Sequence, residues 1–366
     1  MGALLSGADC RWLAYNYTTP GGEAAFFCPA PRFGLYTGVG NGGFLSFDNT
    51  PHAPSTTAYQ SEFLVKEPIY RGSVKDVYRI DETRLEFAFS DRISIFDVVM
   101  PDDIPGKGEA LCDMACHWFE VVDALGIDHH FIERSGPRSM VVKPVTIIRD
   151  ASKLIDGRTN HLVPLEFIAR HYVAGMLFDR IESGKISPEH LGFRPGDAVP
   201  YGAKLPNPYF EMSTKLEPVD RFVTYDEALV ISKLGDDGIQ RIQDICLKID
   251  ATMERLLEST NLIHVDGKKE FGYDIDGALM LVDVFGTADE DRYWERTAYI
   301  QSGDCVELSK EKVRQHYRDI GYKDALYEAR EAETEEPAMP PLPKELLDGT
   351  AHVYRSIADQ MCSVSL

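Results

Sequence analysis

The chain has 366 residues, of which 44% are hydrophobic and 27% are charged, as in an ordinary folded globular protein. Asp and Glu number 59 against 38 Lys and Arg, which gives a formal net charge of -21 at pH 7. This negative balance argues against a nucleic-acid-binding protein, so any phosphate group is expected to bind in a local basic pocket.

The first 67 residues are rich in Gly, Pro, Ser and Thr, and we interpret 1–67 as an N-terminal extension of loops and short strands. Its glycines at positions 38, 40, 42 and 43 are followed by neither a Lys nor a helical pattern, which favours turns over a phosphate-binding loop. The N-terminus lacks the basic start and long apolar stretch of a signal peptide. No apolar run in the chain approaches the roughly 18 residues of a membrane-spanning helix. We therefore expect a cytoplasmic protein without a membrane partner.

Residues 69–80 and 84–90 predict a β-hairpin, because apolar residues alternate with other types in the second segment. The string YRGSVKDVY at 70–78 carries Gly72, which allows a ligand close to the backbone, and Lys75, which can reach a phosphate. These features are typical of a strand lid over ATP. A basic edge strand without a ligand explains the same residues.

Residues 107–125 predict an amphipathic helix, with apolar side chains at intervals of three and four. Within it, Cys112, Cys116 and His117 have the spacing of a helical turn, but no second ligand pair accompanies them. We interpret the three residues as structural. The chain has seven cysteines and no CxxC pair, which indicates reduced thiols.

The middle and end of the chain mix strand and helix patterns. Residues 131–148 predict two short strands, 164–183 carry both kinds of signal, and 238–260 predict a second amphipathic helix. Residues 329–343 contain four prolines and predict a linker, and 343–361 predict a final helix that packs back on the body.

The string LIHVDGKKEFGYDIDGALMLVDVF predicts a second hairpin with its turn at 274–277. A two-residue turn pairs Lys268 with Asp283 and places Glu270 opposite Leu281, all on one face. Glu270 and Asp283 then become diagonal neighbours, with Cα atoms about 7–8 Å apart. The other face, expected in the core, carries Phe271, Tyr273, Met280, Val282 and Val284.

Two carboxylates at this separation can share one Mg²⁺, which takes oxygen ligands and leaves places for phosphate oxygens. Lys268 beside them supplies a positive charge. Arg170, Lys215 and Arg292 lie next to apolar stretches and offer further anchors for a phosphorylated substrate, because guanidinium groups match phosphate oxygens. The alternative is a set of solvated charges and a cross-strand salt bridge.

Six strings, in this order along the chain, resemble the SAICAR synthetase (phosphoribosylaminoimidazole-succinocarboxamide synthase) family. They are YRGSVKDVY, SDRISIFD, IPGKG, VPLEFIARHYVAG, STKLE and VDGKKEFG, and with the VDVF and RYW strings that follow they span about 70–294. The resemblance implies an α+β fold of two lobes, an antiparallel-sheet lid over ATP and a larger α/β lobe. We accordingly expect an ATP-lid lobe at 68–160, a substrate and metal lobe at 161–330, and a linker with the C-terminal helix at 331–366.

The resemblance implies a ligase of purine biosynthesis that joins L-aspartate to the carboxylate of carboxyaminoimidazole ribonucleotide (CAIR), with ATP and Mg²⁺, through an acyl-phosphate. Its partners would be these small molecules, without nucleic acid or membrane, and a homo-oligomer is left open. Such a route needs charge neutralisation and positioning rather than a nucleophilic side chain. The sequence has no Ser/His/Asp or Cys/His signature, which agrees with this chemistry.

The resemblance also implies roles for individual residues. The metal-binding acids would be Glu270 and Asp283, and the catalytic lysines Lys268 and Lys215. The residues expected at ATP are Gly72, Lys75, Lys143, Val163 and Glu166. The residues expected at the other substrates are Arg170 and Arg292, which would hold the ribonucleotide phosphate, with Ser94 and Asp97.

Four positions depart from the family pattern. Ser73 stands where a Lys is frequent, and Met176 where the family string reads AGS, so that a hydroxyl expected at the substrate phosphate is missing. Lys269 stands where an apolar residue is usual, and Val284 where an acid often follows the metal-binding Asp. A divergent relative acting on a similar azole carboxylate, or a non-catalytic nucleotide-binding relative, would also explain them. A small-molecule kinase is disfavoured, because no HRD-like or DFG-like string occurs.

Overall fold

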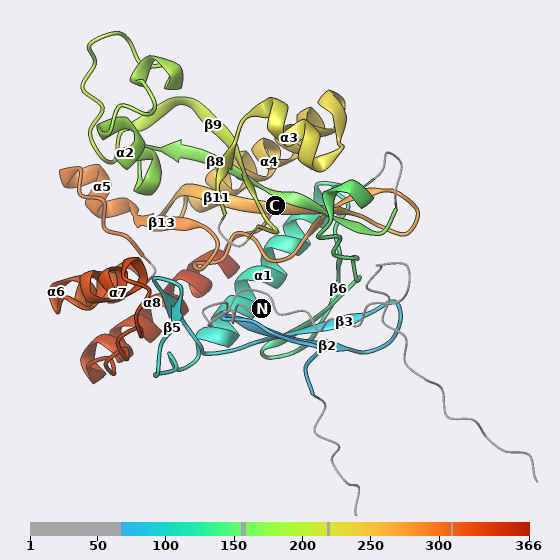
Figure 1. Cartoon of the computed structure of the whole chain (residues 1–366), viewed down its shortest axis with the longest axis horizontal. Coiled ribbons are helices and arrows are strands. Elements are labelled where there is room, and N and C mark those ends of the chain that lie inside the picture. The colour runs from blue at the N-terminus through green and yellow to red at the C-terminus, as the bar shows by residue number, and fades with distance from the viewer. Residues whose placement is uncertain (1–66, 155–158, 218–219, 309) are drawn as a thin grey trace, which may run out of the picture. The chain divides into compact units, whose positions relative to one another are not determined.

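A computed structural model of the chain describes residues 67–154, 159–217, 220–308 and 310–366 (Figure 1). The predicted extension at 1–67 therefore lies, except for Glu67, outside the described residues. Residues Pro68–Leu366 fall within one compact unit. None of the helices in the described part of the chain has both the length and the apolar character that crossing a bilayer requires.

The smaller sheet is antiparallel and confirms the first predicted hairpin. Its five strands run in the order β1-β2-β3-β7-β6. Lys75 lies opposite Phe89, so the YRGSVKDVY string forms the first arm of the hairpin. The strands are β1 (Tyr70–Arg71), β2 (Lys75–Arg79), β3 (Leu85–Phe89), β6 (Phe131–Gly136) and β7 (Ser139–Val142). The pair predicted at 131–148 is therefore present, but its second strand ends at Val142.

The larger sheet has the order β10-β9-β8-β11-β12, with β13 also paired to β11. Its strands are β8 (His161–Tyr172), β9 (Lys204–Thr214), β10 (Phe222–Val223), β11 (Leu262–Tyr273), β12 (Leu279–Val282) and β13 (Arg292–Glu295). Nearly every residue of β8 and β11 is buried, because the two strands lie in the middle of the sheet. The helix α4 (Gly235–Leu257) packs on one face, and α3 (Tyr225–Ser232) precedes it.

Figure 1 shows α1 (Lys107–Ala124) running between the two sheets. The predicted helix at 107–125 is confirmed, and Gly126 follows it with a positive φ of 68°. Trp118 is fully buried, and its Nε1–H donates to the carbonyl of Gly286 at 3.1 Å. Cys112 and Cys116 are buried in the same helix, within the hydrophobic core. The helix thus fills the space that separates the sheets.

The remaining elements surround the two sheets. The bounds are β4 (Ser94–Ile95), β5 (Val98–Val99), α2 (Gly175–Glu182), α5 (Arg296–Ser302), α6 (Glu311–Asp319), α7 (Tyr322–Glu331) and α8 (Lys344–Cys362), with short 3₁₀ turns at Ala151–Lys153 and Pro188–Leu191. The predicted final helix is confirmed as α8, which packs on α1. The predicted linker begins after α7 rather than at 329. The chain has the expected α+β fold.

The register predicted for the second hairpin is wrong by one residue. Tyr273 lies opposite Leu279 and Glu270 opposite Val282, so the loop comprises residues 274–278. The cause is Asp274, whose carboxylate accepts hydrogen bonds from the N–H groups of residues 276 and 278 and so closes a longer loop. Met280 and Val282 consequently leave the main core and join a small apolar cluster, whereas Leu281 packs in the main core.

Candidate active site

One face of the larger sheet carries charged side chains at alternate positions of adjacent strands. Glu166 of β8 lies opposite Glu270 of β11, and Arg170 opposite Asp266. Because successive side chains of a strand point to opposite faces, these residues share one face. The odd-numbered residues of this part of β11 point to the face that α4 covers, where Lys269 pairs with Asp250. The charged face is therefore the face of the sheet opposite α4.

Towards one end of this face, lysines and carboxylates form a compact group, which we call the lysine–carboxylate cluster (Lys75, Glu166, Lys215, Lys268, Glu270, Asp283 and Glu290). Lys215 Nζ lies 2.6 Å from Glu270 Oε1, and Lys268 Nζ lies 2.9 Å from the same oxygen. Both lysines also contact Glu166 Oε1, at 3.3 and 3.0 Å. The strands β8 and β11 and the residue after β9 thus bring these groups together around shared oxygens.

Asp283 joins the cluster although the register correction would place it on the opposite face. It follows the last residue of β12 and has a φ of +60°, a left-handed conformation in which the chain leaves the strand. Its carboxylate forms an ion pair with Lys75 of the smaller sheet. Its carbonyl oxygen lies 3.0 Å from His130 Nε2. The predicted partnership of Glu270 and Asp283 in one site therefore rests on this turn rather than on strand alternation.

Opposite charges in the cluster shift the pKa values of several of its members. Burial alone would raise the pKa of Asp283, but the ammonium groups of Lys75, Lys215 and Lys268 outweigh it and hold this pKa below its usual range. Burial would lower the pKa of Lys268, but the nearby carboxylates raise it well above its ordinary value. The same balance lowers the pKa of Glu166. These shifts favour the charged forms of Asp283, Lys268 and Glu166.

Two members of the site were not found by reading the sequence. Glu290 lies in the loop before β13, and its carboxylate is 3.2 Å from Lys268 Nζ. This loop has no periodicity that could have placed it. Ser213 donates through Oγ to Glu166 Oε2 at 3.0 Å. Ser213 stands in the STKLE string two residues before Lys215, so strand alternation could have indicated it.

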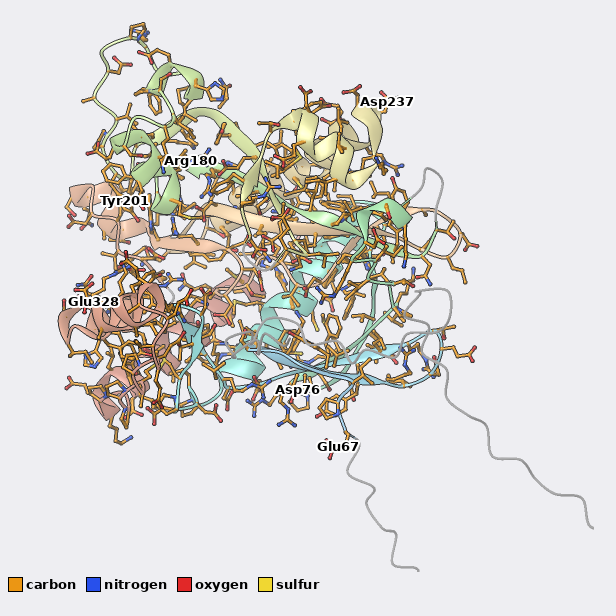
Figure 2. All side chains as sticks on the ribbon, viewed as in Figure 1. Glu67, Asp76, Arg180, Tyr201, Asp237 and Glu328 are labelled. Carbon is orange, nitrogen blue, oxygen red and sulfur yellow. The ribbon has the colours of Figure 1, made fainter. Side chains whose placement is uncertain are left out.

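Farther along the same face, arginines and carboxylates form a second group, the arginine cluster (Arg170, Arg180, Glu211, Asp266, Arg292, Glu307 and Arg314). Arg170 is buried, and it donates to Glu211 at 2.6 Å and to Asp266 at 2.9 Å. Arg180 of α2, labelled in Figure 2, donates to the other oxygen of Glu211 at 2.6 Å. The sequence analysis predicted only Arg170 and Arg292 of its four arginines.

Arg292 lies where the arginine cluster meets the beginning of α2. Its guanidinium is 3.4 Å from Asp266 and 3.3 Å from Glu307. A Cβ atom at Gly175 would lie 2.7 Å from both terminal nitrogens of Arg292, so the absence of a side chain lets the guanidinium approach the first residue of α2. A helix N-terminus beside an arginine is a suitable place for an anion. Met176, the second residue of α2, is 58% exposed at this place.

The other predicted site residues lie outside the two clusters. Val163 is fully buried in the main core, on the face opposite Glu166. Lys143 is exposed at the end of β7, and its N–H donates to the carbonyl of residue 130. The N–H of Gly72 donates to the carbonyl of Lys75 at 2.9 Å in the turn before β2. Ser94 and Asp97 belong to the separate β4–β5 hairpin.

That hairpin has an unusual turn. Phe96 and Asp97 both have positive φ values, of 53° and 64°. The carbonyl of Phe96 accepts a hydrogen bond from Arg330 of α7 at 3.1 Å, and the charge of Asp97 acts on the same guanidinium. A bulky residue in this conformation is rare and is held by its surroundings. The expected substrate contacts of Ser94 and Asp97 stay predictions.

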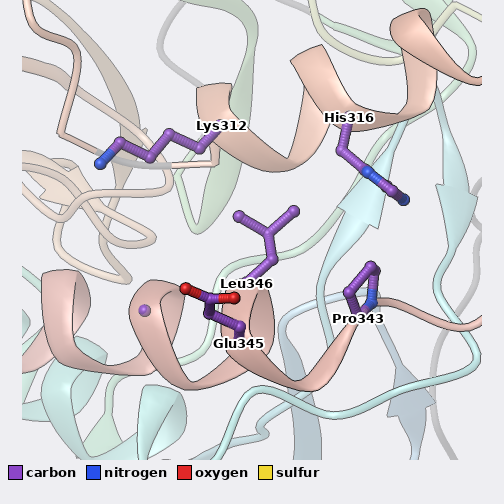
Figure 3. Close-up of a pocket in the computed structure, with 6 residues that line it drawn as sticks. Lys312, His316, Pro343, Glu345 and Leu346 are labelled. Atoms are coloured by element: carbon purple, nitrogen blue, oxygen red, sulfur yellow. The ribbon is translucent and has the colours of Figure 1, made fainter.

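A small apolar cluster adjoins Glu270. Leu162, Met280 and Val282 are buried together, with Val145 and Leu216 packed against them. Val282 lies opposite Glu270, so this cluster shares the face of the lysine–carboxylate cluster. A different hollow lies between α6 and α8 (Figure 3). Its lining residues are Lys312, His316, Pro343, Glu345, Leu346 and Gly349, and it contains none of the predicted site residues.

Two groups of side chains are candidates for a metal ion. In the first, Glu270 and Asp283 offer carboxylate oxygens, which suit Mg²⁺, and each is already in contact with a cation. In the second, ligand atoms of His171, Asp250 and His264 lie within 4.8 Å of one another. The buried ammonium of Lys269 contacts Asp250 there and supplies the positive charge itself. The pair Glu270 and Asp283 stays the predicted Mg²⁺ site, because it offers carboxylate oxygens rather than imidazole nitrogens.

Comparison with known proteins gives a consistent result. The family model for SAICAR synthetase matches residues 68–329. A curated protein of Thermoplasma acidophilum, named phosphoribosylaminoimidazole-succinocarboxamide synthase, is 44% identical over 293 residues, which are 80% of this chain and 97% of that protein. A protein of the same name from Thermoplasma volcanium is 43% identical, over 79% of this chain and 96% of that protein.

Solved structures resemble the fold as well. The SAICAR synthase of Saccharomyces cerevisiae, solved as a complex with SAICAR, has a TM-score of 0.64 and 21% identity, over 83% of this chain and 97% of that one. A SAICAR synthetase solved in complex with ADP has a TM-score of 0.54 and 26% identity, over 74% of this chain and 99% of that one. The first of these similarities concerns the fold alone.

Proposed function

The chain belongs to the SAICAR synthetase family, and from this premise we propose how its two charged clusters divide the work of the reaction. It is a phosphoribosylaminoimidazole-succinocarboxamide synthase, a carbon–nitrogen ligase of purine biosynthesis. Its reaction joins L-aspartate to CAIR at the expense of ATP. An ADP complex of a relative at 26% identity supports the use of ATP.

The observation that carries the proposal is the lysine–carboxylate cluster, in which Lys75 of the smaller sheet meets Asp283 of the larger one. We assign the ATP phosphates to this place. Lys75 lies in β2, Lys215 directly follows β9 and Lys268 lies in β11, and together they offer three positive charges. Developing negative charge on a transferred phosphoryl group is stabilised by fixed cations in a partly buried site. The apolar cluster around Leu162 and Val282 adjoins this place and suits a flat base.

The carboxylates of Glu270 and Asp283 fit a magnesium ion, since they offer oxygen ligands within a site that already holds cations. Mg²⁺, when bound, would offset the charge of the phosphate oxygens. Lys75 and Lys215, which pair with these acids, would then be released to contact the nucleotide. Glu166 contacts both Lys215 and Lys268 and holds them in place.

The arginine cluster is suited to the phosphate of the ribonucleotide. Arg292 lies against the N-terminus of α2, and Arg170 is buried beside it. Guanidinium groups bind phosphate oxygens with two parallel hydrogen bonds. Glu307, whose pKa is raised chiefly by burial, faces Arg292, and its contact with that guanidinium would be exchanged for one with the phosphate.

The reaction proposed for the two clusters has two chemical steps. A carboxylate oxygen of CAIR attacks the γ-phosphorus of ATP, the bond to the β–γ bridging oxygen breaks, and ADP leaves. The amine of L-aspartate then attacks the acyl carbon, the carbon–oxygen bond to the phosphate breaks, and inorganic phosphate leaves while the amine gives up a proton to water. Lys215 and Lys268 offset the negative charge on the oxygens in both steps. Anchoring the ribonucleotide phosphate at the arginine cluster keeps the CAIR carboxylate aligned with the γ-phosphorus of ATP.

A direct test is to incubate the purified chain with ATP, Mg²⁺, CAIR and L-aspartate and to follow ADP. We expect ADP release that requires both CAIR and L-aspartate, with formation of SAICAR in equal amount. ADP at the level of a protein-free control would remove the ligase assignment and favour the non-catalytic relative. Release with another azole carboxylate but not with CAIR would favour the divergent relative. The cytoplasmic location also stays a prediction.

A further inference from the structure

Three consecutive residues before and at the start of β13 point to three different parts of the protein. The carboxylate of Glu290 contacts Lys268 in the lysine–carboxylate cluster, and the guanidinium of Arg292 contacts Asp266 in the arginine cluster. Between them, Asp291 is buried and reaches His264 of β11. The side chain in the middle thus anchors a segment whose two neighbours belong to the two halves of the site.

The anchor of Asp291 is closely fitted. Its Oδ2 lies 2.8 Å from His264 Nε2, and its Oδ1 accepts a hydrogen bond from the N–H of Gly286 at 3.1 Å. The hydroxyl of Tyr293 donates to the carbonyl of Gly286 at 2.8 Å, which ties the two ends of the loop together. Burial alone would lower the pKa of His264, but the hydrogen bond and charge of Asp291 raise it. Both oxygens of Asp291 are therefore satisfied inside the protein.

Position 267 of β11 is shaped to receive this carboxylate. A Cβ atom on Gly267 would lie 2.7 Å from Asp291 Cγ and 2.9 Å from His264 Nε2, distances shorter than any ordinary carbon contact. Only glycine leaves room for Asp291 to lie on the strand. Gly267 directly precedes Lys268, so the loop is held against the same strand that carries the lysine and Glu270.

We propose that Asp291 is a positioning residue, which holds Glu290 at the lysine–carboxylate cluster and Arg292 at the arginine cluster and thereby fixes the spacing of the two halves. The inference rests on the proposed function, in which Arg292 binds the ribonucleotide phosphate. A substrate held at both ends reacts only when its anchors keep their separation, and a misplacement of about 1 Å can cost about 100-fold in rate.

Crystal structures of two variants test the positioning directly, without turnover. Asp291→Ala removes the anchor, and Gly267→Ala displaces it without removing any charged group. We expect both variants to lose the contact of Arg292 with Asp266 and that of Glu290 with Lys268, whereas the rest of the sheet keeps its register. If both contacts persist in both variants, Asp291 positions neither residue and the proposal is overturned. These structures decide the point even if the wild type shows no ligase activity.

Kinetics of the same variants separate positioning from a purely structural role. We expect Asp291→Ala and Gly267→Ala to raise the KM for CAIR about tenfold or more, while the KM for ATP changes much less. Asp291→Asn should stay within about threefold of the wild type, because its amide oxygen can still accept from Gly286 and its NH₂ group can donate to the other tautomer of His264. A fall in Tm with an unchanged KM for CAIR would overturn the proposal.

A matched control is Asp113→Ala. Asp113 of α1 is partly buried and pairs with Arg134 and Arg355, away from both clusters. We expect this variant to lose stability without any change in the KM for CAIR. If Asp113→Ala raises that KM as much as Asp291→Ala does, the effect reflects general destabilisation and the positioning role is refuted.

Discussion

Lys75 Nζ forms an ion pair with the carboxylate of Asp283, across a sequence separation of 208 residues. The lysine belongs to β2 of the smaller sheet, and the aspartate follows β12 of the larger one. Both side chains are largely buried, so the pair holds the two sheets together at the place assigned to the ATP phosphates. In the proposed site, Lys75 would contact the phosphates and Asp283 the metal ion.

Replacing Lys75 should weaken ATP binding in particular. Lys75→Met removes one of three cations from the proposed phosphate site and leaves Asp283 with fewer positive neighbours. We expect the KM for ATP to rise by about tenfold, with a smaller effect on the KM for CAIR, since charge-assisted contacts contribute about 1.5–3 kcal/mol. Steady-state kinetics with each substrate varied in turn measures the difference. Arg84→Met, an exposed position in the turn before β3, is the control and should change neither constant.

Neutralising Glu270 should abolish turnover while the fold survives. Glu270 is buried and contacts both Lys215 and Lys268, and we assign it to the metal. For Glu270→Gln we expect kcat to fall by at least about 100-fold, as for removal of a central electrostatic group. Binding of Mn²⁺ in the presence of ADP, followed by electron paramagnetic resonance, should weaken as well. Unchanged metal affinity would show that another residue holds the ion.

The surface acid Glu217 provides the comparison for that experiment. It pairs with Arg221 at the end of the STKLE string and is well exposed. Glu217→Gln should bind Mn²⁺ and turn over as the wild type does, because exposed ion pairs contribute about 0–1 kcal/mol. A loss of activity in this variant would mean that the site extends beyond the residues assigned to it.

Restoring a hydroxyl at position 176 should tighten the binding of CAIR. Met176 is exposed at the second position of α2, so Met176→Ser should change the free energy of unfolding by only about 0.5 kcal/mol. The serine hydroxyl could donate to a phosphate at the helix N-terminus. We expect the KM for CAIR to fall by two- to fivefold, an order-of-magnitude estimate from one added hydrogen bond. Met176→Ala, measured in parallel, should show no fall, and equal behaviour of the two variants would place the phosphate elsewhere.

The pairing of α1 with α8 should depend on pH in a predictable direction. Asp289 lies 2.6 Å from Lys107 Nζ and accepts a hydrogen bond from Tyr354 of α8. Burial opposes its ionisation, but Lys107 and Lys310 outweigh burial and lower the pKa of Asp289 in the folded protein. A carboxyl whose pKa is lowered by folding contributes stability above its unfolded pKa of about 3.9, and this stability is lost as pH falls through the folded value.

Asp289→Asn tests this by chemical denaturation at several pH values. At pH 7 we expect the variant to be less stable by about 3 kcal/mol, since one partner of a buried ion pair is removed. The difference from the wild type should stay constant from pH 7 to about pH 5 and shrink below about pH 4. A difference that grows on acidification would contradict the assigned charge state. The exposed Asp81, which pairs with Arg84, provides a variant with little expected loss at pH 7.

Local patterns predicted the elements of this fold well. The helix at 107–125 and the hairpin around Lys75 follow from the spacing of apolar residues. Each of these patterns lies entirely within one short stretch of the sequence. The register of the second hairpin does not follow from such spacing, because the side chain of Asp274 closes a longer loop and shifts every pairing by one residue. A two-residue turn would have required no such side-chain hydrogen bonds.

The composition of the site was harder to predict than the elements. Glu166 was expected at ATP only through the family resemblance, and its contact with Lys268 across the β8–β11 pairing was not predicted. Glu290 and Asp291 had no local signal at all, because their loop is placed by Gly267, His264 and the positive φ of Asp283. Contacts between strands distant in sequence are set by tertiary packing, and a one-dimensional pattern does not contain them.

The most direct measurement traces the carboxylate oxygens of CAIR into the inorganic phosphate, instead of measuring a rate. CAIR labelled with ¹⁸O in its carboxylate is converted with ATP and L-aspartate, and the inorganic phosphate is analysed by mass spectrometry. If the carboxylate attacks the γ-phosphorus at the lysine–carboxylate cluster, each phosphate released will carry one ¹⁸O from CAIR. Phosphate without label, formed at the same rate as SAICAR, would contradict the acyl-phosphate route and the role assigned to that cluster.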